Sequence, residues 1–533
     1  GDYNVAIGAY ALEDQTTGDN NVAIGHQALE ANNADNNVAI GYAALDANTT
    51  GTQNIAIGSY ALSANTTAGQ QTAIGYAALQ VSTGIRNTAL GWNAGLSNTT
   101  GTGNALLGAY AGDSNTTAAN NTFVGYDAAP TVTTGGDNTA LGAGALHANA
   151  TSTGITAVGT NNNYHGTGAQ NTSVGTEAME GSSGNSTGAY NVAIGFRAME
   201  QYTTAQDNVA VGYYALQANT TGSNNVAVGH YALDSLTTGG ENVAVGEFCL
   251  QAMTTGSNAT AVGWYAGYAH TSGAYLTAVG RGAARYNTTG ANNTAIGAGA
   301  LAANSTASYN TAVGRSALNT NSTGAHNTAV GYKALEANTT ADNNTAVGLE
   351  ALKANTTGAG NIAIGKGALV ANTTGGANIA VGTGALDAIT TENDCTAVGN
   401  DALGANTASK NTALGSACLS GNTTGIFNTA VGRVAAYVNT TGSNLTALGF
   451  EAVRGNTTGN DNTGIGAQAL RSVTTGGANV GVGNSALRNT TTGSHNTAVG
   501  YKALEANTTA DYNTAVGYGA LIANTTGNKN TAL

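Results

Sequence analysis

Side chains that could carry out chemistry are few in this chain, and they share no arrangement that catalysis requires. The seven His residues, from His26 to His495, have no common spacing. An active site needs a nucleophile, an acid and base, or metal ligands that converge at one place, and no HExxH, CxxC or P-loop string occurs. With 78 Gly among 533 residues, loose G-x-G matches are expected by chance. We therefore predict no enzymatic activity, no cofactor and no metal site.

Charge excludes two further classes of function. The chain has 28 acidic and 15 basic residues, a net charge of −13, and no basic stripe. Phosphate binding needs clustered Lys and Arg, so we do not expect nucleic acid as a partner. Asp is too sparse for a ladder of calcium sites. No run of 18 apolar residues is present, so the sequence predicts no membrane span.

The whole sequence repeats one unit of about seventeen residues, N-T-A-V-G-Y-x-A-L-x-A-N-T-T-G-x-x. Of the 31 intervals between unit starts, 26 are 17 residues long, four are 16 and one is 20. A fixed period of this length is typical of a solenoid, in which each coil buries its apolar face only against its neighbours. We predict an all-β parallel β-solenoid (β-roll) of about 31 coils, roughly 150 Å long at about 4.8 Å per coil.

Position 5 of the unit, counted from the leading Asn, is Gly in all 31 complete units. Such a position requires a positive φ angle or has no space for a Cβ, so we expect a bend there. Among these bend glycines are Gly8, Gly25, Gly41, Gly331, Gly348, Gly500 and Gly517. The four residues before the bend are predicted to form a short strand of a parallel sheet.

In that strand, Val, Ile and Thr alternate with Ala. We predict that the larger side chains at positions 2 and 4 point into the coil and that the Ala side is the outer face. Position 8, which is Ala in 28 of 31 units, and position 9, usually Leu or Met, form the second apolar contact. The predicted core residues include Ile7, Leu12, Ile24, Leu29, Val330, Leu335, Val499 and Leu504. Six or seven residues do not decide whether positions 6 to 12 form a second strand or one helical or 3-10 turn.

The Asn at position 1 recurs in 26 of 32 unit starts. Stacked coils would align these side chains, and likewise the Asn of the A-N-T-T string, in ladders whose amides bond to the coils on either side. Members of the predicted ladder at position 1 are Asn4, Asn21, Asn37, Asn327, Asn344, Asn496 and Asn513. The T-T-G-x-x segment is predicted to close each coil as a turn.

Three cysteines, Cys249, Cys395 and Cys418, are too few and too widely spaced for a disulfide framework. Cys249 and Cys418 replace the Ala at position 8, so we expect them to be small buried side chains. A bridge between chains is the alternative.

The sequence predicts solenoid repeats over residues 1–154 and 191–533, separated by irregular repeats at 155–190. In this middle segment one unit loses its A-L pair and the next carries three extra residues. A kink, a displayed loop, a flexible joint and a decayed repeat are the interpretations left open. The chain starts and stops inside a repeat, so we interpret it as a fragment of a longer polypeptide.

The core N-x-A-[V/I]-G, best seen as N-V-A-I-G at 4–8, 21–25 and 191–195, resembles the head repeats of trimeric autotransporter adhesins (YadA-like). Units of this kind are also similar to those of tail-fibre-like proteins of phages and bacteria. The resemblance implies a homotrimeric structural fibre or stalk, extracellular, on a cell or virion surface, with a host-surface glycan or protein as partner. Exposed Tyr at positions 6 and 7, such as Tyr42, Tyr60, Tyr231, Tyr332 and Tyr501, would then stack on sugars or meet a neighbouring chain, or fill a groove beside the bend.

Two alternatives remain from the residues themselves. Regular Thr at positions 2, 13 and 14 is compatible with an ice-binding or other crystal-surface-binding solenoid. Against this, the sequence places positions 13 and 14 in a turn, and the exchange of Thr with Val and Ile at position 2 indicates an interior side chain. The other alternative is the subunit of a self-assembling extracellular filament.

Overall fold

The computed structural model describes residues 1–184 and 186–533, and it is a parallel β-solenoid of about 31 coils. Each coil contributes one strand of three residues, at positions 2 to 4 of the unit, as predicted for the segment before the bend. No helix occurs among the described residues. The segment after the bend is a run of turns, so neither a second strand nor a helical turn forms there.

The chain divides into two compact units, Gly1–Ser272 and Gly273–Leu533. The first unit holds the strands β1 (Val5–Ile7), β2 (Val22–Ile24), β3 (Val38–Ile40), β4 (Ile55–Ile57), β5 (Thr72–Ile74), β6 (Thr88–Leu90), β7 (Ala105–Leu107), β8 (Thr122–Val124), β9 (Thr139–Leu141), β10 (Thr156–Val158), β11 (Thr172–Val174), β12 (Val192–Ile194), β13 (Val209–Val211), β14 (Val226–Val228), β15 (Val243–Val245) and β16 (Thr260–Val262). The second holds β17 (Thr277–Val279), β18 (Thr294–Ile296), β19 (Thr311–Val313), β20 (Thr328–Val330), β21 (Thr345–Val347), β22 (Ile362–Ile364), β23 (Ile379–Val381), β24 (Thr396–Val398), β25 (Thr412–Leu414), β26 (Thr429–Val431), β27 (Thr446–Leu448), β28 (Thr463–Ile465), β29 (Val480–Val482), β30 (Thr497–Val499), β31 (Thr514–Val516) and β32 (Thr531–Ala532).

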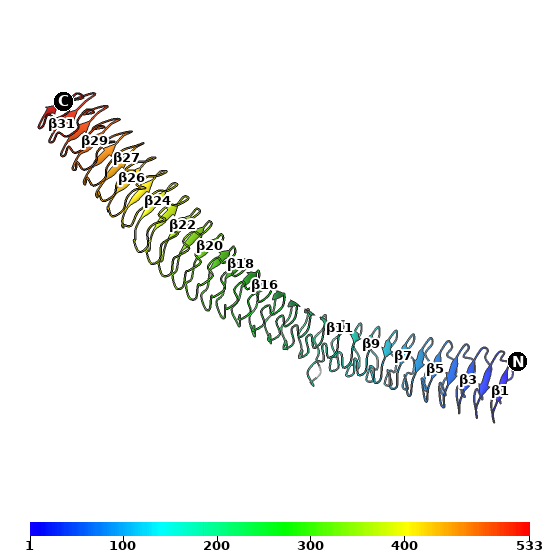
Figure 1. The fold of residues 1–533 in the computed structure, drawn as a ribbon. Helices are drawn as coiled ribbons and strands as arrows, with labels where there is room; N and C mark the ends of the chain where they lie inside the picture. The colour runs from blue at the N-terminus through cyan, green and yellow to red at the C-terminus, as the bar shows by residue number, and fades with distance from the viewer. Residues whose placement is uncertain (185) are drawn as a thin grey trace. The chain divides into compact units, whose positions relative to one another are not determined.

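Within each unit, every strand pairs in parallel with the strand of the next coil, and equal positions of the repeat face each other. Val5 pairs with Val22 and Ala6 with Ala23 in the first unit, and Thr328 pairs with Thr345 in the second. Figure 1 shows the resulting stack of short arrows in both units. In-register pairing places each residue type of the repeat in a row along the axis of its unit.

The irregular repeats at 155–190 lie inside the first unit and keep this register. β10 pairs with β11, and β11 pairs with β12 through Thr172 and Val192, although twenty residues separate these two partners. The added residues therefore lie outside the strand ladder, between 175 and 191. Asn185 is outside the described residues.

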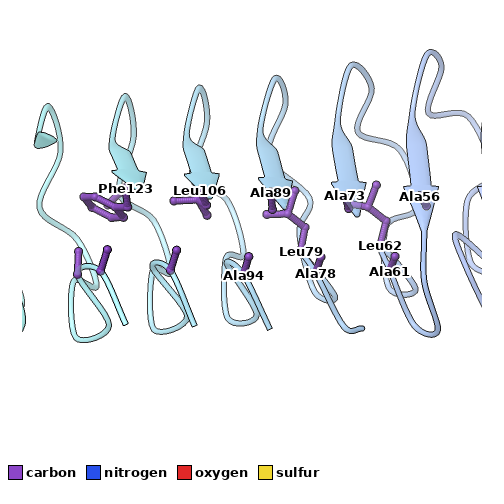
Figure 2. Packing of buried hydrophobic residues seen from close by; sticks show 14 of the residues in the cluster. Ala56, Ala61, Leu62, Ala73, Ala78, Leu79, Ala89, Ala94, Leu106 and Phe123 are labelled. Atoms are coloured by element: carbon purple, nitrogen blue, oxygen red, sulfur yellow. The ribbon is translucent and has the colours of Figure 1, made fainter. Parts of the chain in front are cut away.

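The interior of the coil is narrow and is filled by Ala at positions 3 and 8 and Leu at position 9. In one coil, Ala329, Ala334 and Leu335 are all fully buried. Figure 2 shows the same three positions in neighbouring coils, with Ala73 on the strand and Ala78 and Leu79 on the turn beneath it. The predicted core residues Leu29, Leu335 and Leu504 are fully buried, and Leu12 is partly buried.

The prediction for the strand itself was wrong, because its two faces are reversed. Position 3 Ala points into the coil, whereas the side chains at positions 2 and 4 point outward. Ile7 is 58% exposed and Val499 is 38% exposed, and Ile24 and Val330 are half-buried. A coil of about seventeen residues that already encloses a Leu leaves room for only a methyl group from the strand, so the branched side chains face outward.

Leu at position 9 adopts a left-handed backbone conformation in most coils, for example φ = 54° at Leu335 and φ = 52° at Leu29. This conformation costs an ordinary L-residue about 1–2 kcal/mol. Complete burial of a Leu side chain contributes about 1.5–3 kcal/mol. Burial therefore offsets the backbone cost, and the strain recurs in coil after coil without breaking the stack.

Across three consecutive coils, which start at Asn87, Asn104 and Asn121, the core positions exchange their sizes. Leu106 and Phe123 occupy position 3 in place of Ala, and Gly95 and Gly112 occupy position 9 in place of Leu. A Cβ built on Gly95 would lie 2.6 Å from Cδ1 of Leu106. Figure 2 shows Leu106 and Phe123 projecting from the strand into the space that Leu62 and Leu79 fill from the turn in the preceding coils. The core thus conserves its volume while the contributing position changes.

We predict that Leu106→Ala destabilises its coil by about 2–5 kcal/mol, because Gly95 leaves nothing to fill the cavity. Adding Gly95→Leu restores the Ala-and-Leu arrangement of regular coils and should recover most of this loss. Hydrogen exchange followed by mass spectrometry on peptides covering residues 70–125 measures the local free energy of opening in each variant. Failure of the double variant to recover protection would contradict the volume exchange.

Candidate functional site

The bend glycines at position 5 have both a positive φ angle and no space for a Cβ, the two reasons for Gly considered from the sequence. Their φ angles lie between 125° and 147°, a region that L side chains rarely adopt. In addition, a Cβ built on Gly348 would lie 2.6 Å from the carbonyl oxygen of Gly365, the equivalent residue of the next coil. Any side chain at this position would force successive coils apart, so Gly sets their close spacing.

The Asn residues at position 1 are buried and form a ladder along each unit. The backbone N–H of Asn344 donates to Oδ1 of Asn327 at 3.0 Å, and the side-chain nitrogen of Asn327 donates to the carbonyl of Ala341 at 2.8 Å. The same bond from the backbone N–H of the next Asn joins Asn4 to Asn21, Asn21 to Asn37 and Asn496 to Asn513. Each amide thus satisfies buried backbone groups of two coils.

A second ladder, predicted from the Asn of the A-N-T-T string, is formed by the Asn at position 12. Asn338 donates from Nδ2 to Oδ1 of Asn321 at 2.8 Å and to the carbonyl of Ala341 at 3.0 Å. Asn338 is fully buried, as is Asn355 in the next coil. The fixed A-N-T-T string is the signal for this ladder. In most N-T-T strings the Asn is buried, which closes these formal glycosylation motifs to a modifying enzyme once the chain has folded, whereas Asn489 is exposed and Asn524 is half-buried.

The outward face of the strands, defined by positions 2 and 4 of every coil, is a surface of aliphatic and Thr side chains along each unit. No charged residue occurs at either position in any described strand. Position 4 is Val, Ile or Leu throughout, and many of these side chains are exposed. In the second unit they include Ile296 (40%), Ile364 (41%), Leu414 (46%) and Leu448 (40%). An uninterrupted apolar row of this kind is unusual on a soluble monomer and marks an interaction surface.

Aromatic side chains at positions 6 and 7 form rows beside this face. One row runs through Tyr10, His26, Tyr42, Tyr60, Tyr76 and Trp92, with ring centroids 4.5 to 5.9 Å apart. Tyr231 lies between Tyr214 and Phe248 in a second row, and Tyr501 stacks on Tyr518. The cationic groups of Arg315 and Lys333 lie over the ring of Tyr332 in cation–π contacts. These rings contact one another within the chain, yet Tyr42, Tyr332 and Tyr501 remain 45%, 39% and 43% exposed.

The cysteines are buried and unpaired. Burial raises the pKa of the Cys249 and Cys418 thiols to about 12, so neither is a reactive thiolate at neutral pH. Sγ of Cys249 lies 3.2 Å from the carbonyl oxygen of Ala261, and that of Cys418 at the same distance from Ala430. Both thus occupy the place of the position 8 Ala, as expected.

A cluster of three glutamate side chains lies beside the inserted residues. The carboxylates of Glu177, Glu180 and Glu200 lie within 4.8 Å of one another. Arg197 donates from Nε to Glu177 at 2.5 Å and lies 3.5 Å from Glu200, so a guanidinium already supplies the positive charge at this place. Burial, followed by the charges of Glu177 and Glu200, raises the pKa of Glu180. The group is explained as an ion-pair network.

The described residues form no helix of the length and hydropathy needed to cross a bilayer. The chain matches no family model, and it matches no curated protein.

Buried polar groups compensate for one another where the repeat is irregular. Asn162 and Asn163 replace the Ala and Leu of positions 8 and 9, and Ser173 and Tyr202 replace residues that face them. Ser173 donates its hydroxyl to Oδ1 of Asn162, and the Tyr202 hydroxyl donates to Oδ1 of Asn163 at 2.9 Å. Tyr202 is fully buried, and desolvation raises its pKa well above the usual value. These side chains keep the coil continuous without its Leu.

We expect Tyr202→Phe to destabilise the coils around it by about 1–3 kcal/mol, because Asn163 loses the donor to its buried oxygen. The double variant Tyr202→Phe/Asn163→Leu restores the usual Leu and removes the unsatisfied amide, so it should be at least as stable as the wild type. Local hydrogen exchange over residues 155–205 distinguishes the two variants. Equal loss in both would show that the hydroxyl contact contributes nothing.

Proposed function

We propose that this chain is the subunit of a non-enzymatic fibre whose copies associate through the outward face of the strands. The observation that carries the proposal is the absence of charge from positions 2 and 4 in every described strand, together with the exposed aliphatic row at position 4. Elsewhere on the coil, charged residues are tolerated at positions 7, 10, 16 and 17. A surface free to remain in water would be expected to have accepted charges at some of its many coils.

Self-association is also supported by the repeat itself. Because equal positions stack in rows, two copies that match at one coil also match at the coils on either side. Burying the position 4 side chains against a second copy would contribute about 25 cal/mol per Å² of apolar surface, multiplied over many coils. Position 2 is Thr, Val or Ile in nearly every coil, so this row also fits a dry or nearly dry interface. The resemblance to adhesin head repeats favours three copies around one axis.

The cellular role that fits such an assembly is a stiff stalk or shaft that holds an adhesive surface away from a cell or virion. Its location would be extracellular, and its partner a glycan or protein on a host surface. Support comes from the buried and hydrogen-bonded Asn ladders, which leave little backbone open to proteases. The same features are compatible with a self-assembling extracellular filament, in which copies join end to end.

Placing a single Cys on the outward face tests the interface, because the three native thiols are buried. Val330→Cys lies at position 4, and Thr340→Cys lies at an exposed turn position of the same coil. We expect a short bis-maleimide to cross-link the Val330→Cys protein into covalent dimers on a denaturing gel and to leave the Thr340→Cys protein monomeric. Cross-linking in neither variant, or to the same extent in both, would contradict an interface at this face.

One observation favours a second candidate, binding to ice or another crystal surface. The argument from the sequence against it assumed that Thr at position 2 is interior, and this Thr faces outward instead. It occurs in 13 of the 16 strands of the second unit, in register from coil to coil. Thr at position 13 differs from Thr at position 2 because its hydroxyl is already bonded within the chain. The hydroxyl of Thr339, for example, donates to the carbonyl of Thr356 in the next coil at 3.1 Å.

This second candidate predicts that the chain is monomeric and inhibits ice recrystallisation at micromolar concentration. Replacing Thr311, Thr328 and Thr345 with Lys should then abolish the inhibition, while the same change at the turn residues Thr323, Thr340 and Thr357 should leave it intact. An inactive wild-type protein eliminates this candidate.

A further inference from the structure

Three consecutive coils of the second unit carry Arg at position 10, which makes a short row of guanidinium groups. The residues are Arg454, Arg471 and Arg488, seventeen residues apart. In-register stacking separates equivalent backbone positions by about 4.8 Å. The three side chains are 41%, 31% and 35% exposed, so their heads are open to solvent while their stems lie along the coil. We call these residues the arginine row.

The charge of this segment is opposite to that of the chain as a whole. Residues 433–502 hold five of the fifteen Lys and Arg residues but only two carboxylates, Glu451 and Asp461. The complete chain has a net charge of −13. The excess is confined to a few coils, so the sequence taken over its whole length shows no basic stripe. Folding gathers three of its five cations into one row.

The carboxylates near the row do not neutralise it. Glu451 lies 2.7 Å from Nε of Arg471 and 3.9 Å from Arg454. Glu505 lies 3.6 Å from Arg488 and 3.4 Å from Lys502. Two carboxylates are therefore shared among four cations, namely the three arginines of the row and Lys502. Two positive charges remain in excess. Nε of Arg454 and Nε of Arg488 are shielded from water and have no hydrogen-bond acceptor among the described residues.

A groove runs beside the row. It has a volume of about 290 Å³ and is lined by Arg454, Arg471, Val438, Gly455 and Ser472. The last three occupy position 11 of successive coils, where Gly and Ser leave space next to the guanidinium groups. The groove thus offers fork-shaped cationic donors and a hydroxyl. Both are suited to an oxyanion held against the coil.

An aromatic side chain precedes the arginine row. Tyr437 occupies position 10 of the preceding coil and is 37% exposed. A Tyr ring offers an apolar face with a polar tip, and this combination suits the faces of sugar rings. Row, groove and ring together extend over four consecutive coils, so the ligand that fits them is linear and carries repeated anionic groups.

We propose that the arginine row and its groove bind a linear anionic polysaccharide whose sulfate or carboxylate groups pair with Arg454, Arg471 and Arg488. Each guanidinium takes one oxyanion in a bidentate contact, Ser472 donates its hydroxyl to a neighbouring oxygen, and Tyr437 packs against a sugar ring. The site would give the fibre proposed above its ligand class. It does not rest on self-association, since all its residues come from one chain.

The test uses the full chain and fluorescently labelled oligosaccharides of dextran sulfate and polygalacturonate, with neutral dextran and oligodeoxythymidylate as comparisons. Anisotropy at low salt gives the dissociation constants. We expect one or both acidic sugars to bind, and the better ligand identifies sulfate or carboxylate as the preferred group. The triple variant Arg454→Gln/Arg471→Gln/Arg488→Gln should weaken binding about tenfold or more, because it removes three charge-assisted contacts.

The matched control removes the same formal charge elsewhere in the second unit, through Lys333→Gln/Lys353→Gln/Lys366→Gln, and should change the affinity less than the arginine variant. Tyr437→Ala should weaken sugar binding and leave the weaker binding of oligodeoxythymidylate unchanged. Equal losses in the two triple variants, binding of oligodeoxythymidylate as tight as that of the sugars, or no binding of either acidic sugar would overturn the proposal. The mass of each variant in solution shows separately whether self-association is intact.

Discussion

The close contact between successive coils at the bend glycine is the constraint on which the rest of the structure depends. With φ angles above 120° and the next coil's carbonyl where a Cβ would lie, only Gly permits this approach. Within each of the two units the contact recurs from coil to coil and holds neighbouring coils in the same register. Once the register is fixed, each Asn at positions 1 and 12 meets its equivalent in the next coil, and the two amide ladders follow. Stability is then a sum of many similar contacts between neighbours.

The same constraint decides how surface chemistry is organised in this protein. Any residue type that recurs at one position of the repeat becomes a row along the axis of its unit. Aliphatic side chains at position 4, rings at positions 6 and 7, and Arg at position 10 are three such rows with different chemistry. A function that acts through extended surfaces can evolve by changing one position in several coils while the core remains untouched.

Much of the fold could be predicted from the sequence, because its signals are repeated about thirty times. The seventeen-residue period predicts a solenoid, the unvarying Gly predicts the bend, and the fixed Asn predicts a ladder. The orientation of the strand could not be obtained from alternation alone, since V-A-I alternates equally well in either direction. The better signal was substitution within the chain. Position 8 is almost always Ala. Position 3 departs from Ala mainly where position 9 of a neighbouring coil loses its Leu, as Leu106 does beside Gly95. Positions 2 and 4, in contrast, exchange Val, Ile, Thr and Leu freely. A position that tolerates such exchange faces outward.

Other features depend on tertiary contacts and give no local signal. The left-handed conformation of Leu335 is paid for by its burial between coils, and nothing in the residue type announces it. The hydroxyl of Tyr202 reaches Asn163 across 39 positions of sequence. The arginine row is visible only after the period is applied, because its three members are seventeen residues apart in the sequence.

Our central proposal is that other copies of the chain cover the outward face of the strands. The most direct test is the mass of the purified protein in solution, measured by light scattering at several concentrations and compared with the 52.2 kDa of one chain. We predict a mass three times that of the chain, unchanged on dilution through the micromolar range. A mass of 52.2 kDa at every concentration would contradict the claim and leave the outward face as a surface for ice or another solid.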